Sequence, residues 1–261
     1  MDSIEIYQID AFTDKVFHGN PAAVCLVSHW LNDELLQAIA VENNLSETAF
    51  VMEDKDGYQL RWFTPKGEIS LCGHATLAAG FVLFELQRTN GDLVRFSSLS
   101  GELVVQRDGD KLTMDFPLLN FHHLAHQDIC SRLVDKPVVA AFESELDYLF
   151  LLEDERQVMT ARVDLKALMT LPTRGLILTA KSQDADFYSR CFYPKHSIAE
   201  DPVTGSAHCV LAPFWSERLS KQKLHGIQGS ARRGEVFCEV YQQRVLISGS
   251  CRWYSKGYLV I

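Results

Sequence analysis

Two short stretches place reactive or small residues at the start of an apolar segment. Cys72, Gly73 and His74 open the first segment, and Gly205 and Ser206 open the second. The first turn of a helix carries unpaired amide N–H groups and the positive end of the helix dipole, and glycine lets a ligand approach the backbone. Two such turns facing one cleft would bind a small carboxylate. A plainer interpretation is that each glycine only permits a tight turn. No common nucleotide-binding glycine motif occurs in the chain.

Three titratable side chains near these turns could transfer protons. Glu47 lies in NNLSETAFV, between a predicted helix and an apolar strand. A carboxyl group beside apolar walls tends to have a raised pKa and can act as a general acid or base. His74, and Asp201 in AEDPVTGSAHC, could assist it. Plainer roles are also open: an exposed residue at a strand start for Glu47, a satisfied first-turn side chain for His74, and a helix cap for Asp201.

Cysteine and histidine side chains near the two helix starts raise the questions of metal binding and thiol chemistry. The candidates are Cys72, His74, His208 and Cys209. Their C-x-H and H-C spacings do not match the usual paired-ligand motifs, so we predict no metal site. A helix N-terminus lowers the pKa of a thiol, so Cys72 could be a nucleophile or carry a proton. It could also be an inert cysteine of the core.

The chain repeats itself at an almost constant spacing. RWFTPK at 61–66 returns as RCFYPK at 190–195, an offset of 129 (190 − 61). GHATLAAG, which starts at Gly73, aligns with GSAHCVLA, which starts at Gly205, at an offset of 132 (205 − 73). GELVVQRDGDKLTM aligns with GEVFCEVYQQRVLI at an offset of 133. Three matches in the same order predict two structural halves of similar design.

The same elements are predicted in each half. A strand ends at a Pro-Lys turn, and a short loop, a buried helix and a hairpin follow. The first of these helices, 73–86, is apolar on nearly all faces, so other elements should enclose it. A mostly antiparallel sheet curled around one central helix would do so. The second helix, about 205–219, contains Pro213, which we expect to kink or interrupt it. These features predict an α+β fold.

Composition and charge narrow the class of protein. The chain has 261 residues, of which 47% are hydrophobic and 23% charged, a balance typical of globular proteins. Its net charge of −9 argues against a nucleic-acid partner. No apolar run is long enough to cross a membrane, and the N-terminus lacks a signal-peptide pattern. Since the seven cysteines are scattered, we expect a cytoplasmic protein with reduced thiols.

Four stretches together resemble the phenazine biosynthesis-like (PhzF) family: DAFTDKVFHGNPAAV, NNLSETAFV, RWFTPKGEISLCGHATLAA and AEDPVTGSAHCVL. The family is similar in fold to diaminopimelate epimerase. The resemblance therefore implies two pseudo-symmetric halves, each a mostly antiparallel curled sheet around a central helix, with the active site in the cleft between them. We expect an N-terminal lobe at 1–118, which the last strand (about 252–261) can complete, and a C-terminal lobe at 119–251. The resemblance also implies a homodimer.

A reaction is implied as well. In the best-understood enzyme of this family, a glutamate of the SET motif moves a proton within a cyclic diene acid, and a histidine in GHxT and an aspartate in DPxTGSA assist. Carried over by motif, Glu47 would be the proton shuttle, supported by His74 and Asp201. The residues that would hold the substrate carboxylate are Gly73, Gly205 and Ser206. The resemblance thus implies a cofactor-independent isomerase that moves a proton within a small carboxylic acid.

One departure from the related epimerases affects the mechanism. Those enzymes use two cysteines, one in each half. This chain has Cys72 at the position of the first cysteine. At the position of the second it has the sequence DPVTG, which contains no cysteine, and Cys209 lies several residues beyond that position. A two-thiol racemase is therefore disfavoured. Two alternatives stay open: an amino-acid racemase or epimerase in which Cys72 works with Glu47, and a non-catalytic protein that binds small carboxylates. The motifs do not identify the substrate.

Overall fold

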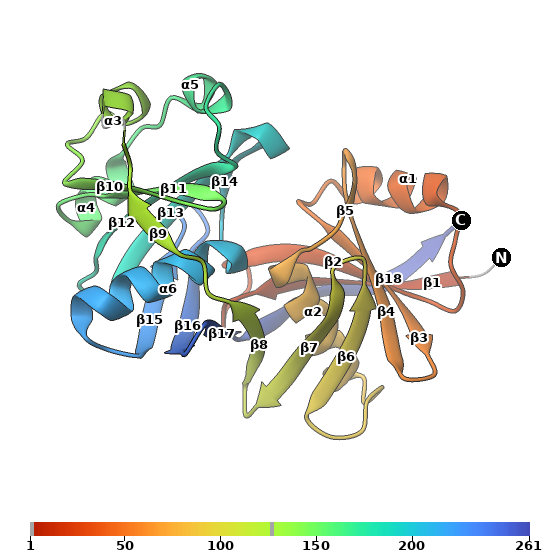
Figure 1. The fold of residues 1–261 in the computed structure, drawn as a ribbon. Helices are drawn as coiled ribbons and strands as arrows, with labels where there is room; N and C mark the ends of the chain where they lie inside the picture. Colours follow the sequence, from red (N-terminus) through yellow and green to blue (C-terminus); the bar gives the residue numbers. More distant parts are fainter. Residues whose placement is uncertain (1–2, 126–127) are drawn as a thin grey trace. The chain divides into compact units, whose positions relative to one another are not determined.

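The computed structural model describes residues 3–125 and 128–261, and it has an α+β fold with curled β-sheet and few helices (Figure 1). The chain divides into two compact units. Unit 1 consists of Met1–Met114 and Ser248–Ile261, and unit 2 consists of Asp115–Ile247. The boundaries fall within strands β8 (Lys111–Pro117) and β17 (Arg244–Gly249).

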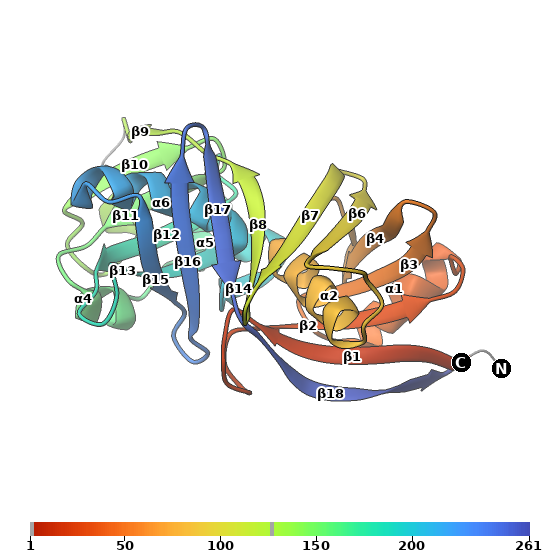
Figure 2. The same cartoon turned by 90° about the horizontal axis from the view of Figure 1, so that it is seen from below.

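Unit 1 is a sheet that surrounds one helix. Its other strands are β1 (Ser3–Ala11), β2 (Asn20–Val27), β3 (Thr48–Asp54), β4 (Gly57–Thr64), β5 (Gly67–Ile69), β6 (Leu93–Ser98), β7 (Gly101–Asp108) and β18 (Cys251–Val260). Its helices are α1 (Asp33–Asn43) and α2 (Gly73–Glu85). β18, the last strand of the chain, pairs antiparallel with β1 (Figure 2). The two ends of the chain therefore form neighbouring strands of one sheet.

Unit 2 contains the remaining elements. Its other strands are β9 (Phe121–His123), β10 (Ala140–Ser144), β11 (Asp147–Leu151), β12 (Gly175–Lys181), β13 (Phe187–Tyr193), β14 (Ile198–Asp201), β15 (Lys223–Gln228) and β16 (Gly234–Tyr241). Its helices are α3 (Asp128–Leu133), α4 (Glu155–Thr160), α5 (Leu165–Met169), the short 3₁₀ helix η1 (Pro194–His196) and α6 (Gly205–Leu219).

The two units repeat the same order of strand pairings. In unit 1, β1–β2 is antiparallel, β2–β3 parallel, β3–β4 antiparallel, β4–β6 parallel and β6–β7 antiparallel. In unit 2, β10–β11, β11–β12, β12–β13, β13–β15 and β15–β16 follow the same alternation. The arginines of the repeated motif occupy matching strands, Arg61 on β4 and Arg190 on β13. The repeat in the sequence therefore corresponds to a repeated architecture.

Helix α2 is apolar around its circumference because strands cover it. All of its residues except Gly73, Phe81 and Glu85 are buried, and it contacts β1, β2, β3, β7 and β18. Gly80 permits the close approach of β7, since a Cβ atom there would lie 2.8 Å from the side chain of Val105. The enclosure predicted for this helix is therefore confirmed.

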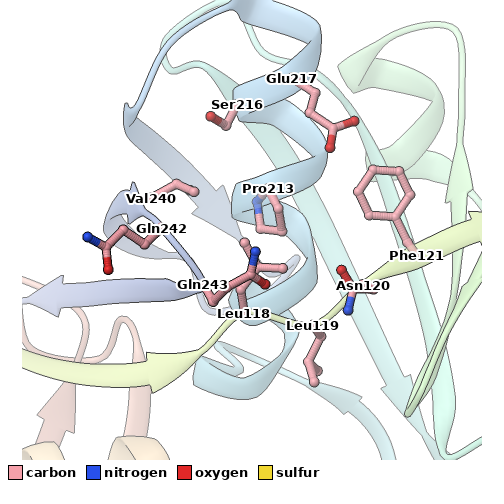
Figure 3. Close-up of a pocket in the computed structure, with 10 residues that line it drawn as sticks. All are labelled: Leu118, Leu119, Asn120, Phe121, Pro213, Ser216, Glu217, Val240, Gln242 and Gln243. Carbon is pink, nitrogen blue, oxygen red and sulfur yellow. The ribbon is translucent and has the colours of Figure 1, made fainter.

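Helix α6 runs through Pro213 without interruption, so the predicted interruption is wrong, while the alternative prediction of a kink stays a prediction. Pro213 has no N–H to donate to the carbonyl of Cys209, four residues earlier. The backbone N–H of Leu119 donates to that carbonyl at 2.9 Å instead. Leu119 lies between β8 and β9, in a segment that passes beside Pro213 (Figure 3). A distant part of the chain thus replaces the hydrogen bond that the proline removes.

No helix in the described part of the chain is both long and apolar enough to cross a membrane. All seven cysteines lie within that part, and each is a buried, free thiol.

Candidate functional site

Glu47 and His74 form a buried pair in unit 1. Glu47 immediately precedes β3, and His74 is the second residue of α2. Glu47 Oε2 lies 3.2 Å from His74 Nε2, and both side chains are less than one-tenth exposed. Within the described residues, neither atom has a hydrogen-bond partner apart from this close approach. The carboxyl group and the imidazole therefore face each other out of bulk water.

The other ring nitrogen of His74 faces two further groups. Its Nδ1 lies 3.5 Å from Cys72 Sγ and 3.4 Å from the side-chain amide nitrogen of Asn20, the first residue of β2. Which of these groups donates depends on the tautomer of the ring. The imidazole therefore links Glu47 on one side to Cys72 and Asn20 on the other.

The pair is charged, which corrects the predicted raised pKa of Glu47. Burial raises the pKa of Glu47, but the charge and hydrogen bonding of His74 outweigh burial and bring it below the ordinary 4.5. Burial lowers the pKa of His74, but Cys72 and Glu47 raise it well above 6.5. Both directions favour a carboxylate paired with an imidazolium. The sequence prediction was wrong because it considered the apolar strand beside Glu47 and not the basic ring that contacts it.

Of the two interpretations of Cys72, a reactive thiol and an inert cysteine of the core, the structure agrees with the second. Burial raises the pKa of its thiol above the ordinary 9.0, the charge of Glu47 raises it further, and His74 offsets only part of this. The lowering expected from a helix N-terminus is therefore outweighed by burial and by a neighbouring carboxylate. The raised pKa favours the protonated thiol, and with a neutral thiol the charge that raises the pKa of His74 comes from Glu47.

One group of possible metal ligands does come together: Glu47, Cys72 and His74 each offer an atom within 4.8 Å of the others. However, His74 turns Nδ1 toward Cys72 and Nε2 toward Glu47. The three residues offer one ligand atom each, fewer than the four ligands of a closed structural zinc site, and the imidazole already contacts a neighbour through each nitrogen. The other two candidates are occupied differently, since His208 Nδ1 lies 2.8 Å from the carbonyl oxygen of Thr204 and burial raises the pKa of Cys209 to about 12.

The first turns of α2 and α6 are built alike. Their N-cap residues, Cys72 and Thr204, are both extended, and neither side chain caps its helix in the described structure. The N-cap carbonyl accepts a side-chain hydrogen bond in each case, from Thr76 Oγ1 at 2.6 Å in α2 and from His208 Nδ1 at 2.8 Å in α6. In α6 the cap side chain does not use the first-turn amides, which is the arrangement that an anion site requires.

Asp201 orders the turn that leads into α6. It is buried, and its Oδ2 accepts a hydrogen bond from Thr204 Oγ1 at 2.5 Å. Gln228 holds the same turn, because its amide nitrogen donates to the carbonyl of Asp201 and its amide oxygen accepts from the N–H of Thr204, both at 3.0 Å. These contacts agree with a role at the helix cap, and they place Asp201 in unit 2 beside Gly205 and Ser206.

Sequence reasoning missed a charged group beside Ser206. Arg174, which immediately precedes β12, donates from Nη1 to Ser206 Oγ at 2.9 Å. Its Nε donates to Asp147 Oδ1 at 2.9 Å, and its Nη2 donates to Asp147 Oδ2. The guanidinium also lies over the ring of Tyr193, with Cζ 4.9 Å from the ring centroid. A signal for Arg174 existed, since it precedes the strand GLILTA as Glu47 precedes TAFVM, at an offset of 127 (174 − 47).

A separate pocket of about 360 Å³ lies beside Pro213 (Figure 3). Its lining residues are Leu118, Leu119, Asn120, Phe121, Pro213, Ser216, Glu217, Val240, Gln242 and Gln243. None of these belongs to the predicted site, and the groups that could transfer protons lie elsewhere.

Comparison with known proteins points to one family. The profile described as phenazine biosynthesis-like protein (PhzC-PhzF) matches residues 9–257. A Pseudomonas aeruginosa protein described as an uncharacterized isomerase is 47% identical over 256 residues, which cover 98% of each chain. A human phenazine biosynthesis-like domain-containing protein is 39% identical over 263 residues, which cover 89% of this chain and 90% of the human one.

Comparison with solved structures points to the same family. A PhzF-family protein of Enterococcus faecalis superposes with a TM-score of 0.96 at 41% identity, and the match covers 100% of both chains. A hydroxyproline epimerase of Agrobacterium vitis, solved with bound trans-4-hydroxy-L-proline, gives a TM-score of 0.63 over 98% of this chain and 92% of the other. At 9% identity, this second likeness concerns the fold alone.

Proposed function

The chain belongs to the phenazine biosynthesis-like (PhzF) family, and from this premise we propose that it is a cofactor-independent isomerase that moves a proton within a small carboxylic acid. The buried contact between Glu47 and His74 carries the proposal, with 3.2 Å between Oε2 and Nε2. It provides a carboxylate that can accept a proton and an imidazolium that stabilises negative charge. Relatives described as isomerases support the reaction class.

The proposed reaction has two proton transfers. The Glu47 carboxylate removes a proton from a saturated carbon adjacent to the conjugated system of the substrate, and the electron pair of that C–H bond delocalises into this system and its carboxylate. The imidazolium of His74 and the first-turn amide donors of α2, beginning at Gly73, stabilise the negative charge that develops. The protonated Glu47 then returns the proton to a different carbon of the same system. No electrons leave the substrate, so the reaction requires no oxidant or reductant.

The position of Cys72 favours one base over two. A two-base epimerase needs its bases on opposite faces of one carbon, each about 3 Å from it, and therefore roughly 6 Å apart. Suitable atoms of Glu47, Cys72 and His74 lie within 4.8 Å of one another. Glu47 and Cys72 therefore belong to the same side of any substrate that contacts both, which supports transfer across a single face.

In unit 2, we propose that Gly205 and Ser206 hold the substrate carboxylate at the N-terminus of α6, and that Asp201 keeps this turn in place. Hydrogen bonds from Thr204 and Gln228 to Asp201 support the second role. Weaker but measurable ligand binding in the variant Ser206→Ala, with an intact Glu47–His74 pair, is the expected result.

The experiment is a screen for hydrogen exchange in deuterated water. The protein is incubated with a panel of cyclic dienoic acids and 2-amino acids, and incorporated deuterium is measured by mass spectrometry. We expect exchange into a dienoic acid, and we expect Glu47→Gln to lower its rate by about 10²–10⁴-fold. Glu53→Gln, on the exposed end of the same strand, is the matched control and should keep the wild-type rate.

Other outcomes would change the assignment. Exchange confined to amino acids, with inversion of the α-carbon, would favour the racemase or epimerase alternative. A carboxylate that binds but never exchanges would favour a non-catalytic binding protein.

A further inference from the structure

Arg174 occupies the place in unit 2 that Glu47 occupies in unit 1. Glu47 immediately precedes β3, and Arg174 immediately precedes β12, the corresponding strand in the repeated order of pairings. Glu47 reaches His74, the second residue of α2, and Arg174 reaches Ser206, the second residue of α6. The same position in the two units is thus occupied by an acid, Glu47, in unit 1 and by a permanent cation, Arg174, in unit 2.

The correspondence also holds for the preceding strands, β2 in unit 1 and β11 in unit 2. Asn20, the first residue of β2, contacts the ring of His74. Asp147, the first residue of β11, binds the guanidinium of Arg174 through both carboxylate oxygens. Asp147 is 1% exposed, whereas the side chain of Arg174 is 25% exposed. The buried carboxylate therefore fixes a guanidinium that is itself open to a ligand.

The contact with Arg174 determines what the hydroxyl of Ser206 can do. A guanidinium only donates hydrogen bonds, so Ser206 Oγ must be the acceptor in the 2.9 Å contact. The hydroxyl proton is then left to donate to another group. A carboxylate at the start of α6 accepts such a bond, and the positive charge behind Oγ polarises the O–H group and strengthens it.

We propose that Arg174 is a positioning residue for the substrate carboxylate: it holds the Ser206 hydroxyl as a donor and places a positive charge at the N-terminus of α6. This inference rests on the proposed function, because it names the device by which unit 2 would recognise an anionic substrate. It makes carboxylate recognition a property of unit 2, separate from the proton chemistry of Glu47 in unit 1.

An arginine is required here because of its shape. Nε and Nη2 serve the two oxygens of Asp147 while Nη1 reaches Ser206, and the planar group stacks on Tyr193. A lysine ammonium is a single point charge and cannot hold this fork geometry. Arg174→Lys therefore keeps a counter-charge for Asp147 but releases Ser206, which makes it a sharper test than removal of the charge.

Arg190→Lys is the matched control. Arg190 also lies in unit 2, binds both oxygens of Glu200 and stacks on Phe192 with Cζ 4.9 Å from the ring centroid. Its Nη1 contacts the carbonyls of Val158 and Ala161 rather than the start of α6. It therefore reproduces the packing and ion pairing of Arg174 without the contact to Ser206.

The test measures binding of benzoate, with benzamide as the neutral probe of the same shape, to the full chain by titration calorimetry. We expect the wild-type protein to prefer benzoate, and we expect Arg174→Lys to weaken benzoate by about tenfold to a hundredfold while benzamide changes little. Arg190→Lys should leave both affinities unchanged. Combining Arg174→Lys with Ser206→Ala should cost little more than Ser206→Ala alone, because Arg174 acts through that hydroxyl.

Three results would overturn the inference: equal binding of benzoate and benzamide by the wild-type protein, an unchanged benzoate affinity in Arg174→Lys, or full additivity with Ser206→Ala. The proposed function is tested separately. Glu47→Gln should lower the rate of deuterium exchange by about 10²–10⁴-fold while it leaves benzoate affinity intact, so a failure of the proton chemistry is distinguishable from a failure of carboxylate recognition.

Discussion

The two units have one contact in the same place, but the side chains that form it differ in their chemistry. In each, the residue before the third strand of the repeated order contacts the second residue of the enclosed helix: Glu47 with His74 in unit 1, and Arg174 with Ser206 in unit 2. The first pair can exchange protons, because both of its members titrate. The second cannot, because a guanidinium does not lose its proton in proteins. The difference suggests that the repeated scaffold divides the work, with acid–base chemistry in unit 1 and recognition of charge in unit 2.

The N-cap carbonyls of α2 and α6 also keep the same backbone arrangement while the side chains that contact them differ. Thr76 supplies a hydroxyl to the carbonyl of Cys72, and His208, its counterpart at an offset of 132 (208 − 76), supplies a ring N–H to that of Thr204. Both helices need this carbonyl satisfied, and two unrelated side chains do it. Sequence identity between the halves therefore understates how similar the two helix starts are.

The largest effect that separates the units should come from Asp147→Ala. Removal of a buried carboxylate leaves the guanidinium of Arg174 without its partner, and we expect a loss of about 3–5 kcal/mol in the free energy of unfolding. The counterpart change in unit 1, Asn20→Ala, removes a neutral group and should cost about 1–3 kcal/mol. Urea unfolding measures both.

Asp115→Ala is the control for this comparison. Its ion pair with Arg244 is about two-fifths exposed on both sides, so its loss should cost less than about 1 kcal/mol. An Asp147→Ala variant as stable as Asp115→Ala would show that the ion pair of unit 2 does not order its site.

A second difference concerns acid stability. Burial lowers the pKa of His208 to about 4, whereas its counterpart Thr76 does not titrate. Because the pKa of the folded state lies below the ordinary 6.5, protonation favours the unfolded chain. The stability that neutral His208 provides is present above about pH 6.5 and is lost as pH falls toward 4. The total is about 3 kcal/mol, from 1.36 kcal/mol per pKa unit.

His208→Gln, which keeps a side-chain N–H donor, should remove this part of the acid dependence. Chemical unfolding of both proteins at pH 7 and pH 4.5 measures it. A wild-type protein whose stability falls no more than that of His208→Gln between these pH values would contradict a neutral, buried His208.

The smallest expected effect is on the titration of the pair in unit 1. The pKa of Glu47 lies below 4.5, so its contribution to stability is lost as pH falls through that range. The pKa of His74 lies well above 6.5, so its contribution is lost as pH rises through its folded value. In His74→Gln, the cation is gone and burial remains, so the pKa of Glu47 should rise. Carbon-13 NMR of labelled glutamate carboxyl groups follows this change, and a pKa that stays below 4.5 in the variant would show that His74 is not its cause.

Much of the fold could be predicted from the sequence, because it depends on local patterns. The apolar run after Gly73 predicted an enclosed helix, and the R-x-F-x-P-K repeat predicted two similar halves. Long-range contacts could not be predicted. Helix α6 continues through Pro213 because Leu119 satisfies the carbonyl of Cys209, and nothing near Pro213 in the sequence indicates that.

The candidate site shows the same limit. The motifs identified Glu47 and His74 but gave the wrong pKa direction for Glu47, because that direction depends on how the two side chains meet. Arg174 and Asp147 were missed because they lie between the third and fourth family motifs, in a part of the chain that carries none. Their roles depend on three contacts within unit 2 rather than on spacing.

The most direct test of the central claim compares solvent-deuterium incorporation in Glu47→Gln and Cys72→Ala with the same substrate and under the same conditions. If Glu47 is the group that moves the proton, exchange slows by about 10²–10⁴-fold in Glu47→Gln and persists in Cys72→Ala, because the raised pKa of Cys72 favours its protonated thiol. Exchange that survives in Glu47→Gln and disappears in Cys72→Ala would contradict the account.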